Sequence, residues 1–136
     1  MSGSVLKIAY VGLGGCVGAI MRYSMSVLLQ RYVESWPVGT LVVNVTGCFV
    51  LGVVIDWSER VAWLTPEMRL LFATGFCGGF TTMSSFVYEL LEMVRSREYY
   101  YAMWYGGGTV VGSCVSFVAG RLAWSTIMAG VRVLWN

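Results

Sequence analysis

The chemistry available to this sequence depends on a few polar side chains that interrupt long apolar stretches. Asn44 carries an amide, and Arg22 and Glu89 carry charges that are not easily assigned to loops. Amides and guanidinium groups donate hydrogen bonds to anions. The sequence has no His, which excludes imidazole acid–base catalysis and imidazole metal sites. These residue types favour ion recognition over catalysis.

Asn44 lies near the middle of an apolar stretch, with Thr40 one turn before it and Gly47 and Cys48 about one turn after it. In one interpretation the amide joins two helices within the membrane. In the other, its NH₂ group replaces water around an anion in a dry passage. The sequence leaves both interpretations open.

Two rows of residues recur at every fourth position near the C-terminus. One row offers a phenol and two hydroxyls along one helix face and comprises Tyr105, Thr109, Ser113 and Phe117. The other consists of small residues, Gly108, Gly112, Ser116 and Gly120. The small row predicts close helix packing in lipid. The hydroxyl row is either a polar track or a set of side chains that bond the preceding turn's carbonyls.

A further helix face carries Met83, Phe86 and Glu89. This face either packs in the core or lines an ion path, where the positive edge of a phenyl ring could accompany an anion without holding it tightly. A charge left at a helix centre costs about 2.5–3.5 kcal/mol, so Arg22 and Glu89 should face protein or water. Arg22 either gathers anions at a vestibule or extends to the lipid headgroups.

The composition places these residues in a membrane. Of 136 residues, 57% are apolar and 12% charged, whereas soluble domains average about 45–50% and about 25%. Mean hydropathy is +0.71. A soluble domain of this length buries roughly two-thirds of its unfolded surface, so the apolar surplus must face lipid. A net charge of +2 without a Lys/Arg run gives no nucleic-acid-binding patch.

We expect an all-α integral membrane protein, with one transmembrane domain over residues 1–136. Its four helices are predicted at about 5–30, 38–57, 68–94 and 99–128, since a span takes about 20 residues. The glycines within 75–82 predict a break in the third helix. Irregular backbone at membrane depth must line a cavity or hold an ion, and its carbonyls could coordinate a small cation. A purely structural kink is the alternative.

The positive charges that can be assigned to one side of the membrane are nearly balanced between the two sides. Four lie on the side of the termini (Lys7, Arg60, Arg69, Arg132) and three on the other (Arg31, Arg95, Arg97). Because the positive-inside bias sets orientation, such a chain could insert both ways, and two inverted copies could then pair. We therefore expect an antiparallel, dual-topology homodimer.

Three sequence blocks resemble the Fluc or CrcB-type fluoride channels of bacterial plasma membranes. They are GGCVGAIMRY at 14–23, VGTLVVNVTGCFVLG at 38–52 and GFCGGFTTMSSF at 75–86. The resemblance implies a multi-pass protein of the bacterial inner membrane and an antiparallel homodimer with two pores. It also implies a structural sodium ion that is not transported. The expected activity is passive, selective fluoride efflux that limits toxicity.

The resemblance also implies roles for particular residues. Sodium would be bound by the backbone carbonyls of Gly78 and Thr81, and Asn44 would be the pore asparagine. Arg22 would lie near a vestibule, and Glu89 matches a pore-proximal acid. Further pore positions are Tyr105, Thr109 and Ser113 on the fourth helix and Thr82, Ser84 and Ser85 after the break.

One position departs from the family pattern. The family has paired phenylalanines beside the pore, and here Met83 replaces the first while Phe86 retains the second. A thioether has no polarised ring edge, although it can fill the same volume. We therefore expect Phe86 to supply the ring contact and conduction to survive.

Other functions fit the sequence less well. A small four-helix, dual-topology multidrug or cation exporter would need a carboxylate in the first helix, whose charges are instead Lys7 and Arg22. A membrane enzyme would lack a plausible nucleophile and base. A purely structural membrane subunit remains open.

Overall fold

A computed structural model describes residues 2–31, 36–61 and 64–134 of the chain, without the side chains of residues 2 and 132–134. Every regular element in these ranges is helical. The elements are α1 (Ser2–Gln30), α2 (Val38–Arg60), α3 (Pro66–Arg69), the π-helical segment η1 (Leu70–Cys77), α4 (Gly78–Phe80), α5 (Met83–Arg95) and α6 (Tyr99–Leu134).

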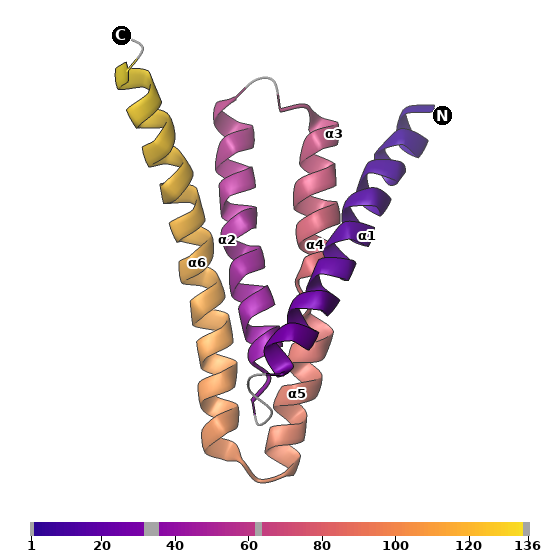
Figure 1. Cartoon of the computed structure of the whole chain (residues 1–136), viewed down its shortest axis with the longest axis vertical. Helices are drawn as coiled ribbons and strands as arrows, with labels where there is room; N and C mark the ends of the chain where they lie inside the picture. Colours follow the sequence, from indigo (N-terminus) through magenta and orange to yellow (C-terminus); the bar gives the residue numbers. More distant parts are fainter. Residues whose placement is uncertain (1, 32–35, 62–63, 135–136) are drawn as a thin grey trace.

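Four helical stretches are long and apolar enough to cross a membrane. They are Gly3–Gln30, Val38–Arg60, Pro66–Arg95 and Tyr99–Val131. The predicted all-α fold with four spans is therefore confirmed. Figure 1 shows both termini at the same end of the molecule, as an even number of spans requires, with the turn between α5 and α6 at the opposite end.

The third span is broken, as the sequence predicts, but not by unwinding at its glycines. Gly75, Gly78 and Gly79 all lie in helical segments. The break consists of two extended residues, Thr81 with ψ 159° and Thr82 with ψ 109°. The Thr82 side chain then caps α5 by accepting a hydrogen bond from the Ser85 N–H at 3.2 Å.

The glycines instead allow α1 and the third span to pack backbone against backbone. A Cβ at Gly14 would overlap the carbonyl oxygen of Leu71, and a Cβ at Gly18 would overlap that of Phe76. A Cβ at Gly79 would likewise meet the backbone of Gly15. Such contacts maximise dispersion between membrane helices, so local helix propensity was a poor guide to the role of these glycines.

The predicted small-residue row of α6 packs on α2 over most of its length. Ser116 donates a hydrogen bond to the Val45 carbonyl at 2.8 Å, and a Cβ at Gly120 would overlap the Phe49 carbonyl oxygen. Gly112 lies close to Val45 as well, whereas nothing lies within 4 Å of a Cβ at Gly108. The row is therefore a packing surface from Gly112 onward.

A charged cluster ties α2 to α6 near the end that carries the termini. Asp56 is only 2% exposed, and its carboxylate contacts Arg60 at 2.6 Å and Arg121 at 3.6 Å. Arg121 also binds Glu59 at 2.5 Å. The second helix was predicted to end at about residue 57, but α2 continues to Arg60 and Asp56 is buried within it.

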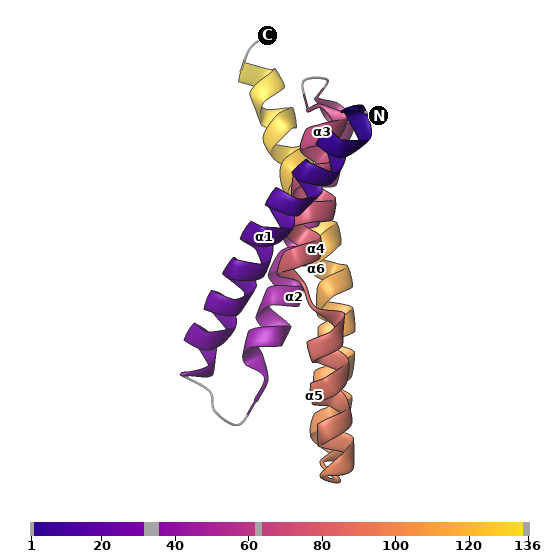
Figure 2. The same cartoon turned by 90° about the vertical axis from the view of Figure 1, so that its right-hand side faces the viewer.

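Large apolar surfaces on the outer helices remain uncovered within the single chain. Only 11% of the most apolar window of the first span and 6% of that of the fourth are buried. Figure 2 shows α1 and α5 diverging at the end opposite the termini. These faces need lipid or a second chain as their surroundings.

Candidate functional site

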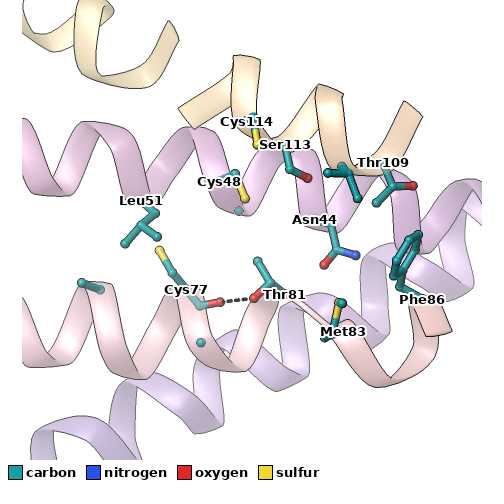
Figure 3. Close-up of a pocket in the computed structure, with 14 residues that line it drawn as sticks. Asn44, Cys48, Leu51, Cys77, Thr81, Met83, Phe86, Thr109, Ser113 and Cys114 are labelled. Carbon is teal, nitrogen blue, oxygen red and sulfur yellow. Dashed lines mark hydrogen bonds between the residues drawn. The ribbon is translucent and has the colours of Figure 1, made fainter. Parts of the chain in front are cut away.

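A groove of about 420 Å³ runs between α2, the third span and α6 beside the break (Figure 3). None of its fourteen lining residues is charged. Seven of the predicted site residues line it: Asn44, Gly78, Thr81, Met83, Phe86, Thr109 and Ser113.

Asn44 bonds to the backbone at the break through both the nitrogen and the oxygen of its side-chain amide. Its Nδ2 donates to the Thr82 carbonyl at 3.1 Å, and its Oδ1 accepts from the Thr82 N–H at 2.7 Å. This reciprocal pair satisfies both backbone groups of an extended residue that has no helical partner. Within the described residues, no acceptor is assigned to the second Nδ2 proton, and Asn44 lines the groove. The two interpretations of Asn44 are therefore compatible in one side chain.

The carbonyls at the end of α4 divide into bonded and unbonded groups. The Thr81 N–H and Oγ1 both donate to the Cys77 carbonyl at 3.0 Å. The Gly79 carbonyl accepts from Arg22. Across residues 2–31, 36–61 and 64–134, no hydrogen-bond donor is assigned to the carbonyls of Gly78 and Thr81. These two oxygens lie beside the negative end of a helix and have the chemistry that a hard cation requires.

Arg22 is half-buried, and its Nε donates to the Gly79 carbonyl at 3.1 Å. The guanidinium group thus lies at the carboxyl end of α4, where a positive charge is favourable. The structure places Arg22 at the break instead of along the lipid-facing surface. It does not line the groove.

Glu89 of α5 links its helix to α2 and α6. Its carboxylate accepts from the Thr40 hydroxyl at 2.7 Å and from the Tyr105 hydroxyl at 2.5 Å. Tyr105 is only 1% exposed, and its ring centroid lies 5.4 Å from that of Phe86. Phe86 lines the groove, whereas Tyr105 does not. Sequence analysis missed the role of Thr40, for which the only signal was its position one turn before Asn44.

The two hydroxyls that α6 presents to the groove differ in how free they are to bind an ion. The Thr109 hydroxyl donates to the Tyr105 carbonyl of its own helix at 2.7 Å, which leaves only oxygen lone pairs to face outward. Ser113 is half-buried, and among the described residues its hydroxyl has no assigned partner. Phe86 is 5% exposed and Met83 is 70% exposed, so the ring is fixed and the thioether is open to lipid or to a partner.

Three predicted pore residues gather at the break instead of in the groove. The Thr82 hydroxyl donates to the Ser85 hydroxyl at 2.9 Å and lies 3.3 Å from the Ser84 hydroxyl. Neither Thr82, Ser84 nor Ser85 lines the groove. Their hydroxyls form a small hydrogen-bonded network at the N-terminus of α5.

Comparison with known proteins identifies the chain's relatives. The family model described as "CrcB-like protein, Camphor Resistance (CrcB)" matches residues 9–121. A protein of Prosthecochloris aestuarii named "Fluoride-specific ion channel FluC" is 42% identical over 113 residues, covering 83% of this chain and 88% of the relative.

Two further relatives carry the same name. The protein of Chlorobium phaeobacteroides strain BS1 is 44% identical, covering 79% of this chain and 85% of its own length. That of Methanopyrus kandleri is 37% identical and covers 96% of this chain and 92% of its own length. A match of this extent, on a four-span fold with a broken third helix, assigns this multi-pass membrane chain to a known group: it belongs to the CrcB family.

Proposed function

We propose that the protein is a fluoride-selective channel that lets fluoride leave the cell passively and so reduces its toxicity. The observation that carries this proposal is the uncharged groove at the break, lined by Asn44, in a chain that shares 42% identity with a protein named a fluoride-specific ion channel. A channel is not an enzyme, and no reaction is needed to explain the site.

The groove offers fluoride neutral partners in place of water. The free N–H of Asn44 and the hydroxyl of Ser113 are donors, and the buried ring of Phe86 can present its positive edge. Each donor offsets part of the dehydration cost of the ion. Because no charged side chain lines the groove, binding stays weak enough for release.

The break is proposed to be held by a structural sodium ion that is not transported. The carbonyls of Gly78 and Thr81 are its proposed ligands, because in the described part of the chain neither is assigned a donor. A two-fold axis through the break would double two ligands into four. If sodium supports the pore, replacing it on both membrane sides with N-methylglucamine should slow fluoride release, and unchanged release would contradict the sodium site.

The functional unit is proposed to be an antiparallel homodimer with two pores in the plasma membrane. The exposed faces of α1 and α6 provide apolar surface for a second copy and for lipid. Arg121 adds a positive charge at the end that carries the termini, but Asp56 and Glu59 pair with it. Even with Arg121 counted, the two ends differ by only two positive charges, which supports insertion in both orientations.

The decisive experiment is ion release from liposomes that contain the pure protein. With a fluoride gradient and a potassium shunt, we expect rapid fluoride release and negligible chloride release. Equal release of both anions, or none, would contradict the proposal.

The same assay separates the channel from a cation exporter. An exporter that exchanges protons for a cationic substrate would respond to an imposed pH gradient and would release no fluoride. No acidic residue lies in α1, and none lines the groove. The structure therefore offers such an exporter no carboxylate in the required helix.

A further inference from the structure

Three cysteines from three different elements line the groove at the break. They are Cys48 of α2, Cys77 of η1 and Cys114 of α6. Cys16 of α1 does not line the groove, and all four cysteines are free thiols. A cysteine in a helix commonly serves as a small apolar residue, but it is also a nucleophile and a metal ligand. The groove therefore presents metal-binding chemistry that the proposed passage of fluoride does not use.

Cys48 and Cys77 approach each other because α2 packs tightly on the third span at this level. A Cβ at Gly47 would overlap the methyl group of Thr81. Cys48 follows Gly47, and Cys77 lies one turn before Thr81, whose hydroxyl donates to the Cys77 carbonyl at 3.0 Å. The two thiols are close enough to interact electrostatically. Figure 3 shows both sulfur atoms directed into the space between α2 and the third span.

The surroundings of the two thiols select the kind of ion that they can hold. Cys77 is only 2% exposed and Cys48 is half-buried. No charged side chain lines the groove, so a net charge left there would be costly. Two thiolates and one divalent cation form a complex without net charge. The site therefore favours a divalent ion over a monovalent one.

The number of ligands narrows the choice further. Among residues 2–31, 36–61 and 64–134, no three His, Cys, Asp or Glu side chains are placed to hold one metal ion. A bound ion must therefore accept two protein ligands. Thiolates prefer soft metals, and the mercuric ion is the soft divalent cation that forms stable, linear complexes with two thiolates.

We propose that Cys48 and Cys77 form a two-thiolate site for the mercuric ion, and that an ion bound there closes the groove. Neutral HgCl₂ can enter the uncharged groove. Both S–H bonds and both Hg–Cl bonds break, two S–Hg bonds form, and two protons and two chloride ions leave. Mercury remains Hg²⁺ throughout, so no oxidant or reductant is needed.

The position of the site explains why a bound ion would stop conduction. Cys48 lies one turn after Asn44 on the same face of α2. Cys77 directly precedes Gly78, whose carbonyl is a proposed sodium ligand. The ion would fill the groove next to Asn44 and would link α2 to the third span. Closure rests on the proposed function, whereas metal binding does not.

The first test measures how firmly the purified protein holds mercury. The variant Cys16→Ala with Cys114→Ala keeps only the proposed pair and is called the pair variant. Adding Cys48→Ala or Cys77→Ala to it leaves a single thiol. Each protein is loaded with HgCl₂ in detergent and washed with the monothiol 2-mercaptoethanol, and its bound mercury is measured by mass spectrometry.

We expect the pair variant to retain one ion per chain after this wash. Each single-thiol variant should retain about tenfold less, because the second thiol of a pair binds intramolecularly at a high effective concentration. Two single-thiol variants are compared so that failure of one to fold leaves the other for the comparison.

The second test measures closure in liposomes that contain the same proteins, with 2-mercaptoethanol present throughout. Fluoride release by the pair variant should fall about tenfold when HgCl₂ is added, because the pair retains the ion against the monothiol. Release should recover when the dithiol dithiothreitol removes the metal. The single-thiol variants should keep most of their release. Each variant is compared with itself before mercury is added, so differences in basal rate do not matter.

Three results would overturn the proposal. They are equal retention by the pair variant and the single-thiol variants, retention of half an ion per chain, which would indicate a bridge between two copies, and undiminished fluoride release with one ion bound per chain. If the pair variant and the unmodified protein release no fluoride before mercury is added, the proposed function fails instead. The retained mercury still decides whether the two thiols share an ion.

Discussion

At the scale of single residues, the site combines structural and ion-binding roles in the same side chains. Asn44 closes both backbone hydrogen bonds of Thr82 and still faces the groove. Glu89 accepts hydrogen bonds from two hydroxyls and thereby fixes the Tyr105 ring next to that of Phe86. Substitutions at these residues should therefore show which of them affect fluoride release and which affect the stability of the fold.

Asn44→Asp should abolish fluoride release. The substitution replaces the N–H that faces the Thr82 carbonyl with an oxygen and places a negative charge in the groove. At an effective dielectric constant of about 20, this charge opposes a fluoride ion at about 4 Å by about 4 kcal/mol. The measurement is the initial rate of release from liposomes. Thr46→Val on the same helix is the control, because among the residues that the structure describes Thr46 bonds only carbonyls of its own helix. Rapid release by Asn44→Asp would contradict the pore assignment.

Tyr105→Phe should lower the free energy of unfolding by about 1 kcal/mol. The variant keeps the ring beside Phe86 but removes the hydrogen bond to Glu89, and a typical hydrogen bond contributes about 1 kcal/mol net. Thermal unfolding in detergent measures the change. Tyr88→Phe, at a side chain that is 68% exposed, should change stability by less than about 0.5 kcal/mol. Equal effects of the two variants would show that the hydrogen bond contributes little.

At the scale of elements, the sequence predicts four spans and a broken third helix, because length and hydropathy are strong signals. The position of the break is less predictable. Sequence analysis attributed the break to the glycines, but Gly75 and Gly79 fit against α1, and the chain leaves helical geometry at Thr81 and Thr82. The partners of Asn44 and Arg22 come from backbone 38 and 57 residues away, which no local pattern indicates.

The close contact of α1 with the third span leads to a matched pair of glycine variants. Gly18→Ala should destabilise the fold by about 2 kcal/mol, since its Cβ would overlap backbone atoms of Phe76 and Phe80 that cannot move independently. Gly12→Ala is the control, because nothing lies within 4 Å of a Cβ there and alanine favours the helix. Denaturant titration in mixed micelles compares the two. If Gly18→Ala were as stable as Gly12→Ala, the two helices would have to be farther apart than described.

At the scale of the whole molecule, the two ends differ little in positive charge. The unburied faces of α1 and α6 also leave the single chain incomplete. Both features follow from the sequence in outline, but the pairing of Arg121 with Asp56 across two helices does not. An inverted pair of copies would account for the balanced charge and the uncovered surface together.

Orientation can be biased without touching the groove. Adding arginines near the termini, Gly3→Arg with Ser4→Arg, should place that end in the cytoplasm. Adding them at the turn between α5 and α6, Ser96→Arg with Glu98→Arg, should place the opposite end there. If the working unit is an inverted pair, each variant expressed alone should fail to protect cells from fluoride, and the two expressed together should restore protection. Full protection by either variant alone would show that parallel copies or single chains suffice.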